Sequence, residues 1–133
     1  MATSGYSGKP LFQKLGLRSG MTCLSLRPPA HFETLMMGAE GVRFLRRAGA
    51  PADLVMAFCR RRSETKILFE RALMNVSLGG MIWMAWPKKS SPLYLDVTGQ
   101  DFRDLILPQG WVDVKVCAVD DDWSALKFLK RKT

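Results

Sequence analysis

Two nearly unbroken apolar runs, residues 53–59 and 81–86, constrain the fold of this chain more than any other feature. Short runs of this kind are typical of strands that are covered on both faces of a parallel sheet. Between them, Ser63 begins a segment whose apolar residues recur at helical spacing and which ends at Gly79-Gly80. A strand, a helix and a strand in this order predict a right-handed crossover, and therefore an α/β fold.

The remaining apolar segments extend this pattern in both directions. Two strands, 111–119 and 123–129, flank the acidic turn 120–122, which predicts a closing hairpin with one antiparallel strand. We therefore predict a small Rossmann-like three-layer sandwich, with a mostly parallel sheet of about six strands that ends in this hairpin. The other predicted elements are strands at 21–27 and 41–46 and helices at 11–15, 30–37 and 98–106.

Length and composition indicate one domain, which we assign to residues 10–133 after a glycine-rich arm at residues 1–9. No apolar run reaches the roughly 18 residues that a membrane-spanning helix needs, and the first ten residues do not resemble a secretory signal. Three widely spaced cysteines and one histidine favour neither a disulfide framework nor a metal site. We expect a cytoplasmic protein with no membrane interaction.

The order of the predicted elements resembles that of the S-adenosylmethionine (SAM)-dependent methyltransferases, whose sheet also ends in an antiparallel hairpin. Residues 78–83 are similar to the turn before their fifth strand, and residues 110–119 with 123–130 are similar to their closing hairpin. The resemblance covers the second half of the chain and concerns topology. It implies the methyltransferase-like sheet order.

The turn after the first predicted strand departs from that family. A SAM or dinucleotide site needs glycines there, because the backbone must turn tightly and approach the ligand closely. Pro28 and Pro29 occupy this turn and remove two N–H donors, and Arg46-Arg47 replaces the acidic residue expected after the second strand. We therefore expect no cofactor, S-adenosylmethionine included.

Basic residues gather at one edge of the predicted sheet. The chain has a net charge of +8, and many of its 20 Lys and Arg residues directly follow predicted strands. Ligands of open α/β sheets bind at the carboxyl ends of the strands, so an anionic ligand is expected at this edge, beside the acidic turn and His31. The candidate ligand-binding residues are Arg27, Arg60, Arg61, Trp86, Lys88, Lys89 and Asp120. The alternative is that these charges are solvated strand ends.

No catalytic or metal constellation accompanies this edge. His31 has no serine or cysteine partner in the sequence pattern, and a lone histidine is more often structural. The segment Ser7-Gly8-Lys9-Pro10 lacks the spacing and the hydroxyl residue of a phosphate-binding loop. The chain is accordingly expected to be a binding protein rather than an enzyme.

Several motifs resemble an uncharacterised bacterial family of unknown function. They are Gly5 to Leu11 with Lys14-Leu15-Gly16, Trp86 to Lys89, and Val112 to Asp120 followed by Trp123 to Lys127. These motifs span nearly the whole chain, but the resemblance implies no activity, cofactor or catalytic residue.

Three functions remain open from the sequence. The first is a non-catalytic domain that binds a nucleotide, a phosphorylated metabolite or RNA at the basic edge. The second is a reduced SAM-dependent methyltransferase, favoured by the sheet order and the terminal hairpin. The third is a structural or protein-interaction domain whose positive charge attracts an acidic protein partner.

Overall fold

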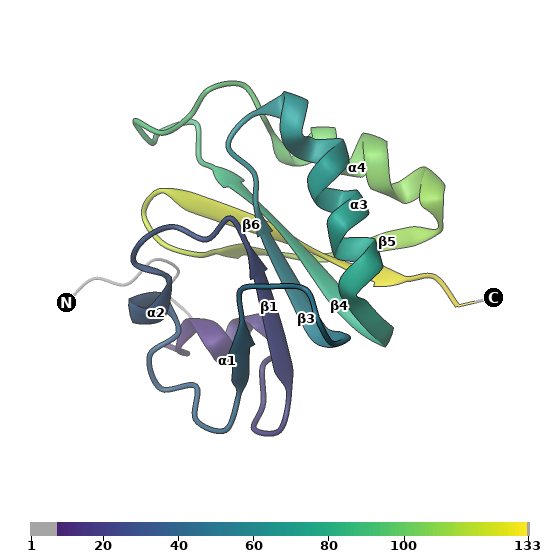
Figure 1. Cartoon of the computed structure of the whole chain (residues 1–133). Helices are drawn as coiled ribbons and strands as arrows, with labels where there is room; N and C mark the ends of the chain where they lie inside the picture. Colours follow the sequence, from purple (N-terminus) through teal and green to yellow (C-terminus); the bar gives the residue numbers. More distant parts are fainter. Residues whose placement is uncertain (1–7, 133) are drawn as a thin grey trace.

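The chain folds around one six-stranded sheet with the order β2-β1-β3-β4-β6-β5 (Figure 1). The computed structural model describes residues 8–132. Strands β1 to β4 are parallel to one another, whereas β6 is antiparallel to both β4 and β5. The predicted six-stranded sheet with a closing antiparallel hairpin is confirmed. The strands are β1 (Thr22–Leu26), β2 (Arg43–Leu45), β3 (Ala52–Phe58), β4 (Val76–Pro87), β5 (Trp111–Ala118) and β6 (Trp123–Lys130).

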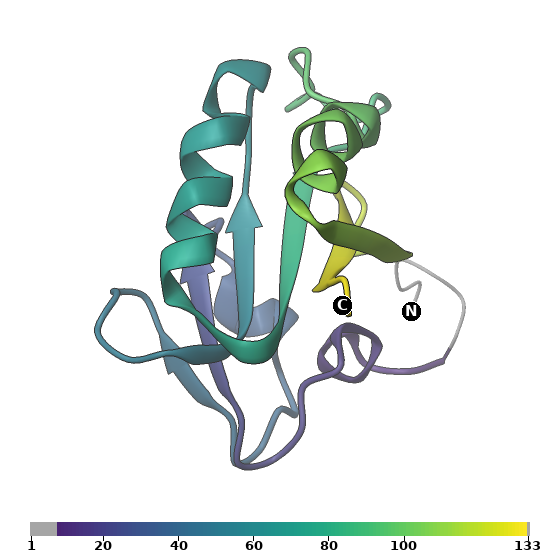
Figure 2. The same ribbon diagram turned by 90° about the vertical axis from the view of Figure 1, so that its right-hand side faces the viewer.

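Helices cover both faces of this sheet and make it the middle of three layers (Figure 2). Apolar side chains of α3 and α4 pack on one face, and those of α1 and α2 pack on the other. The helices are α1 (Leu11–Leu15), α2 (Phe32–Leu35), α3 (Thr65–Asn75) and α4 (Gly99–Ile106), with short 3₁₀ turns η1 (Arg62–Glu64) and η2 (Leu107–Gln109).

The two apolar runs of the sequence form the centre of the sheet. Six of the seven residues of β3 are buried, as expected for a strand with helices on both sides. Successive residues of β4 alternate between the two cores, so Met84 packs beneath α3 and α4, whereas Trp83 lies on the α1 side and donates its indole N–H to the carbonyl of Leu15. The core therefore follows directly from the pattern of the sequence.

The boundary between α3 and β4 differs from the prediction. The helix ends at Asn75 and the strand begins at Val76, so Gly79-Gly80 lies inside β4 and does not cap the helix. The pairing of β3 with β4 shifts register between Ala52 and Leu54, and Gly79 has a φ of +78°. A Cβ on Gly80 would lie 2.9 Å from the carbonyl oxygen of Asp53, so the close approach of the strands requires glycine.

The end signals of other helices agree with the prediction. Thr98 caps α4 in a capping box with Asp101, and Gly16 ends α1 with a φ of +92°. Most of the predicted arm at residues 1–9 lies outside the described residues. No helix in the described part of the chain is long and apolar enough to cross a membrane.

Candidate functional site

The topology singles out the carboxyl ends of β1, β2 and β3. From β1 the chain runs outward to β2 at the edge of the sheet and then returns to β3 on the other side of β1. The carboxyl end of the sheet beside such a reversal is where open α/β sheets bind their ligands. Two groups of side chains lie at this end: the lining of a cavity beneath α2, and a polar network that connects to the β5–β6 hairpin.

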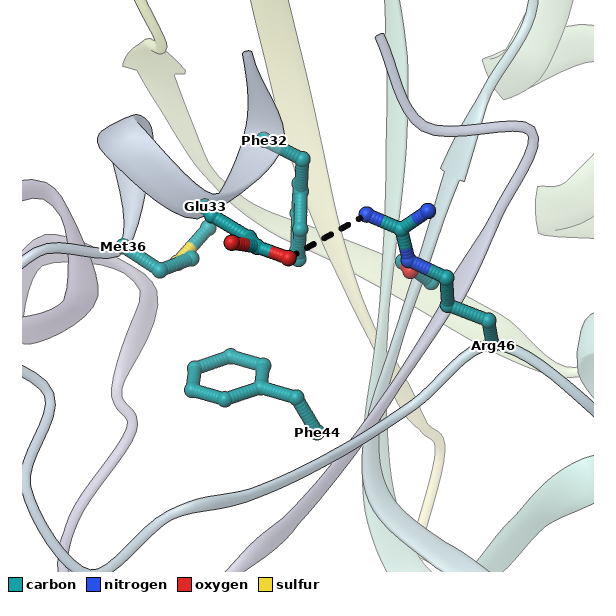
Figure 3. A pocket seen from close by; sticks show the side chains of 6 residues that line it. Phe32, Glu33, Met36, Phe44 and Arg46 are labelled. Atoms are coloured by element: carbon teal, nitrogen blue, oxygen red, sulfur yellow. Dashed lines mark ion pairs between the residues drawn. The ribbon is translucent and has the colours of Figure 1, made fainter. Parts of the chain in front are cut away.

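The cavity has a volume of about 370 Å³, within the range of small-molecule sites (Figure 3). Its walls combine apolar and aromatic side chains with three polar ones. The rings of Phe32 and Phe44 pack edge to face, with 6.0 Å between their centres. The lining residues are Ser25 of β1, Phe32, Glu33 and Met36 of α2 and its end, and Phe44 and Arg46 of β2 and its end.

An ion pair lies at the solvent side of this cavity. A carboxylate oxygen of Glu33 is 3.8 Å from a guanidinium nitrogen of Arg46, and the two side chains are 90% and 60% exposed (Figure 3). At that exposure the pair contributes little to stability, so both groups remain able to hydrogen-bond a ligand. The cavity thus presents one carboxylate and one guanidinium at its opening.

Ser25 is a buried residue of the cavity lining. The residue is 2% exposed, and its hydroxyl oxygen is buried without a hydrogen-bond partner among the described residues. A buried hydroxyl with no partner is costly, and such groups in native proteins call for an explanation. A polar ligand atom in the cavity would supply the missing partner.

The second group of residues begins at the turn after β1. Arg27 has a φ of +52°, a left-handed conformation that is rare for residues other than glycine and that concentrates at functional sites. Its guanidinium forms an ion pair of 2.8 Å with Glu64, and its carbonyl accepts a hydrogen bond of 2.9 Å from the Arg60 guanidinium. The structure therefore brings Arg27 and Arg60 together, although they are 33 residues apart.

This network continues to the β5–β6 hairpin. The Arg60 guanidinium lies 5.2 Å from the centre of the Trp123 ring, within the range of a cation–π interaction. One carboxylate oxygen of Asp120 accepts hydrogen bonds from the backbone N–H groups of Asp122 and Trp123, and the other is 2.7 Å from Nε2 of His31. Asp120 and His31 thus meet at this edge, as the strand order predicts.

The structure places the other candidate residues differently. Trp86 is half-buried and packs on Phe102 of α4, with 5.7 Å between ring centres, so its place is the core beneath α3 and α4. The backbone N–H of Lys88 donates to the carbonyl of Asp122. Arg61 and Lys89 are exposed. A ligand-binding role for these four residues stays a prediction.

The cavity was not predicted from the sequence. Arg46-Arg47 directly follows the second strand where an acidic residue was expected, whereas the fold supplies the carboxylate of Glu33 from α2. The signal that could have found it is an acidic residue in the first turn of the helix that follows β1, since that helix packs back over the ends of β1 and β2.

The buried thiols of Cys23 and Cys59 add no nucleophile to the cavity or to the polar network beside it. Burial raises the pKa values of Cys23 and Cys59 to about 12, so both are protonated thiols at neutral pH. Among the described residues no group of three or more histidine, cysteine or acidic side chains could hold a metal ion.

Several solved structures with a similar fold are methyltransferases. A SAM-dependent methyltransferase from Aquifex aeolicus matches 90% of this chain and 87% of its own, with a TM-score of 0.61 and 11% identity. The fibrillarin pre-rRNA processing protein of Methanococcus jannaschii matches 98% of this chain and 72% of its own, with a TM-score of 0.56 and 9% identity. At these identities the similarity establishes a Rossmann-like, methyltransferase-type fold.

Sequence comparisons give no such result. No family model matches this chain, and no curated protein matches it either. The resemblance of its motifs to an uncharacterised bacterial family therefore stays a prediction.

The expectation that the chain takes no cofactor, S-adenosylmethionine included, is contradicted by the similar structures. A magnesium protoporphyrin IX methyltransferase from Synechocystis with bound SAM matches 90% of this chain and 74% of its own, with a TM-score of 0.57 and 10% identity. A structure of the same methyltransferase with bound SAH also matches 90% of this chain, with 8% identity. The expectation rested on the prolines after β1 and on the missing acidic residue after β2. In the folded chain Glu33 brings a carboxylate to the end of β2. The missing acidic residue directly after β2 in the sequence is therefore no argument against SAM.

Proposed function

We propose that this protein binds S-adenosylmethionine in the cavity beneath α2 and acts as a small methyltransferase. The observation that carries the proposal is the cavity itself at the carboxyl ends of β1 and β2. It combines a buried Ser25 hydroxyl, which has no partner within the described part of the chain, with an exposed carboxylate of Glu33. The similarity of the fold to methyltransferase structures favours this function over a non-catalytic anion-binding domain.

The side chains of the cavity fit the adenosine part of this cofactor. Phe32, Met36 and Phe44 offer an apolar and aromatic environment for the adenine ring. The Glu33 carboxylate is an acceptor for the ribose hydroxyls, and the Ser25 hydroxyl is able to donate to or accept from the base. When bound, the cofactor supplies an activated methyl group on a sulfonium sulfur.

The amino-acid part would be held by side chains. Pro28 and Pro29 have no backbone N–H to offer, so the glycine-type cradle of backbone amides is absent from this turn. The guanidinium of Arg46 lines the cavity and is a donor suited to a carboxylate.

Isothermal titration calorimetry with SAM and with its demethylated product tests the proposal. The Glu33→Gln variant removes a charged acceptor, and we expect its affinity for SAM to fall about tenfold or more. Glu40→Gln changes an exposed glutamate outside the cavity and is the matched control. Absence of binding at millimolar SAM, or equal affinities for the two variants, would refute the proposal.

A second candidate function rests on the basic edge. Arg27, Arg60 and Arg61 follow β1 and β3, and the chain carries a net charge of +8, which favours a nucleotide, RNA or an acidic protein as partner. The structurally similar fibrillarin is a pre-rRNA processing protein, which supports RNA.

Binding of short RNAs and nucleotides at two salt concentrations, with the wild type and a Lys88→Glu/Lys89→Glu variant, tests this second function. Affinity should fall as salt rises and should be lower for the variant. An affinity that neither salt nor the variant changes would exclude it.

A further inference from the structure

The pair formed by His31 and Asp120 has the geometry of a proton acceptor with its orienting carboxylate. Nε2 of His31 lies 2.7 Å from a carboxylate oxygen of Asp120, across 89 residues of sequence. Because a carboxylate only accepts, Nε2 carries the hydrogen of this contact when the ring is neutral. The lone pair of Nδ1 is then free, and no described residue forms a hydrogen bond with it in the structure.

Both members of the pair are held in place by the backbone. Asp120 turns its second carboxylate oxygen toward the backbone N–H groups of Asp122 and Trp123, at 2.9 and 2.8 Å. His31 is the N-cap residue of α2, and its carbonyl accepts a hydrogen bond from the N–H of Leu35. The imidazole is therefore oriented by a carboxylate that cannot rotate without breaking its two hydrogen bonds to the backbone of the hairpin turn.

The pair lies where a ligand could reach it. The side chain of His31 is 47% exposed, whereas that of Asp120 is 21% exposed, so the imidazole is the more accessible member of the pair. His31 directly precedes Phe32, whose ring lines the cavity. From that ring a row of edge-to-face contacts runs through Phe58 to Trp123, the residue whose backbone N–H holds Asp120.

We propose that His31, oriented by Asp120, is the general base that takes a proton from the methyl acceptor, an inference that rests on the proposed methyltransferase function. The acceptor class is a molecule with a hydroxyl or ring N–H nucleophile. Its O–H or N–H bond would break, the proton would pass to Nδ1 of His31, and the bonding pair would stay on the nucleophilic atom. That atom would form the new bond to the methyl carbon as the bond from this carbon to the sulfonium sulfur breaks, and the electron pair of the broken bond would remain on sulfur in the demethylated product. The resulting imidazolium is stabilised by the Asp120 carboxylate and returns its proton to water.

A contribution to stability alone does not explain why Asp120 is held beside His31. A pair between an exposed imidazole and a carboxylate contributes little to stability. The hairpin also has another carboxylate, that of Asp122, which accepts a hydrogen bond from the Ser91 hydroxyl at 2.8 Å. Of these two side chains, Asp120 alone joins the hairpin to the turn after β1, at the edge where the topology places a ligand.

The Asp120→Asn variant tests the pair without requiring an acceptor. Asparagine keeps one oxygen for the two backbone N–H groups, but its amide nitrogen replaces the oxygen that faces His31 and donates to Nε2. The ring hydrogen should then move to Nδ1 and remove the free lone pair. Since His31 is the single histidine of the chain, its ¹⁵N shifts report this tautomer without ambiguity.

Reaction of the protein with diethyl pyrocarbonate gives an independent readout. This reagent acylates an unprotonated imidazole nitrogen, so Asp120→Asn should react several-fold more slowly than the wild type. Asp104→Asn, an exposed aspartate on α4, is the matched control and should react at the wild-type rate. A wild-type ring with its hydrogen on Nδ1, or equal reaction rates in wild type and Asp120→Asn, would overturn the proposal.

Methyl transfer from labelled SAM to a phenol, a nucleoside and a short RNA separates this inference from the proposed function. His31→Gln should bind SAM with wild-type affinity, since His31 does not line the cavity, but transfer should slow by about 100-fold or more. Undiminished transfer by His31→Gln would refute the general base and leave the methyltransferase in place. Failure of the wild type to bind SAM would refute the proposed function, and the general base with it.

Discussion

Replacing Ser25 by alanine should stabilise the ligand-free protein and weaken its binding of SAM. Among residues 8–132 the Ser25 hydroxyl has no hydrogen-bond partner, and leaving such a buried group unpaired costs about 1 to 3 kcal/mol. Alanine removes the hydroxyl and little else, so we expect a gain of about 1 kcal/mol in the free energy of unfolding. For a chain of this size that gain corresponds to a rise in melting temperature of about 3 to 5 °C.

Ser91→Ala is the matched control for this experiment. Ser91 is also buried, at 8% exposed, but its hydroxyl donates to the Asp122 carboxylate at 2.8 Å and accepts from the backbone N–H of Leu93 at 3.0 Å. Loss of a partnered hydroxyl should lower the free energy of unfolding by about 1 to 3 kcal/mol. Thermal and urea unfolding of the two variants, without ligand, should therefore give changes of opposite sign.

The same Ser25→Ala protein should bind SAM about two- to tenfold more weakly, the equivalent of one lost hydrogen bond. Calorimetry measures this change directly. A Ser25→Ala protein that is less stable than wild type would mean that the hydroxyl already has a partner. A variant that binds SAM with unchanged affinity would remove Ser25 from the proposed site.

Three further predictions concern stability and reactivity. Thr98→Ala removes the capping box of α4 and should lower the free energy of unfolding by about 1 kcal/mol in urea titrations, whereas an unchanged midpoint would contradict the cap. The hydrogen bond from Arg103 holds the pKa of Asp113 below its usual 3.8, so the stability from this pair is present above pH 4 and is lost as the pH falls through the lowered pKa. When the stability of the Asp113→Asn variant is measured at falling pH, this loss of stability should not occur. Burial raises the pKa of Cys59 to about 12, so its thiol should react with a disulfide reagent at pH 8 only after unfolding, and rapid reaction of the native protein would refute its burial.

The strands were predictable because each is encoded by a local pattern. The run at residues 53–59 became β3, and the acidic turn between two apolar segments became the β5–β6 hairpin. The glycine pair Gly79-Gly80 was misread because glycine favours both the end of a helix and an irregular strand pairing. Only the approach of the Asp53 carbonyl to within 2.9 Å of a Cβ on Gly80 distinguishes the two.

The candidate site was predictable only where it follows from strand ends. Arg27, Arg60 and Asp120 were expected at one edge, and in the structure Arg60 contacts both Arg27 and Trp123, whose backbone N–H donates to Asp120. The cavity depends on α2, a helix of four residues without a strong local pattern, so its lining could not be anticipated. Trp86 was expected at the edge, but alternation along β4 directs it to the core, where Gly99 leaves room for its ring.

The proline turn after β1 has a consequence for the thermodynamics of binding. A glycine-rich turn keeps its conformational freedom until a ligand orders it, at a cost of about 1 to 2 kcal/mol of backbone entropy per residue. In Arg27-Pro28-Pro29 two pyrrolidine rings remove much of that freedom before any ligand arrives. This turn should therefore lose little backbone entropy when a ligand binds in the neighbouring cavity, so its ordering should add little to the free-energy cost of binding.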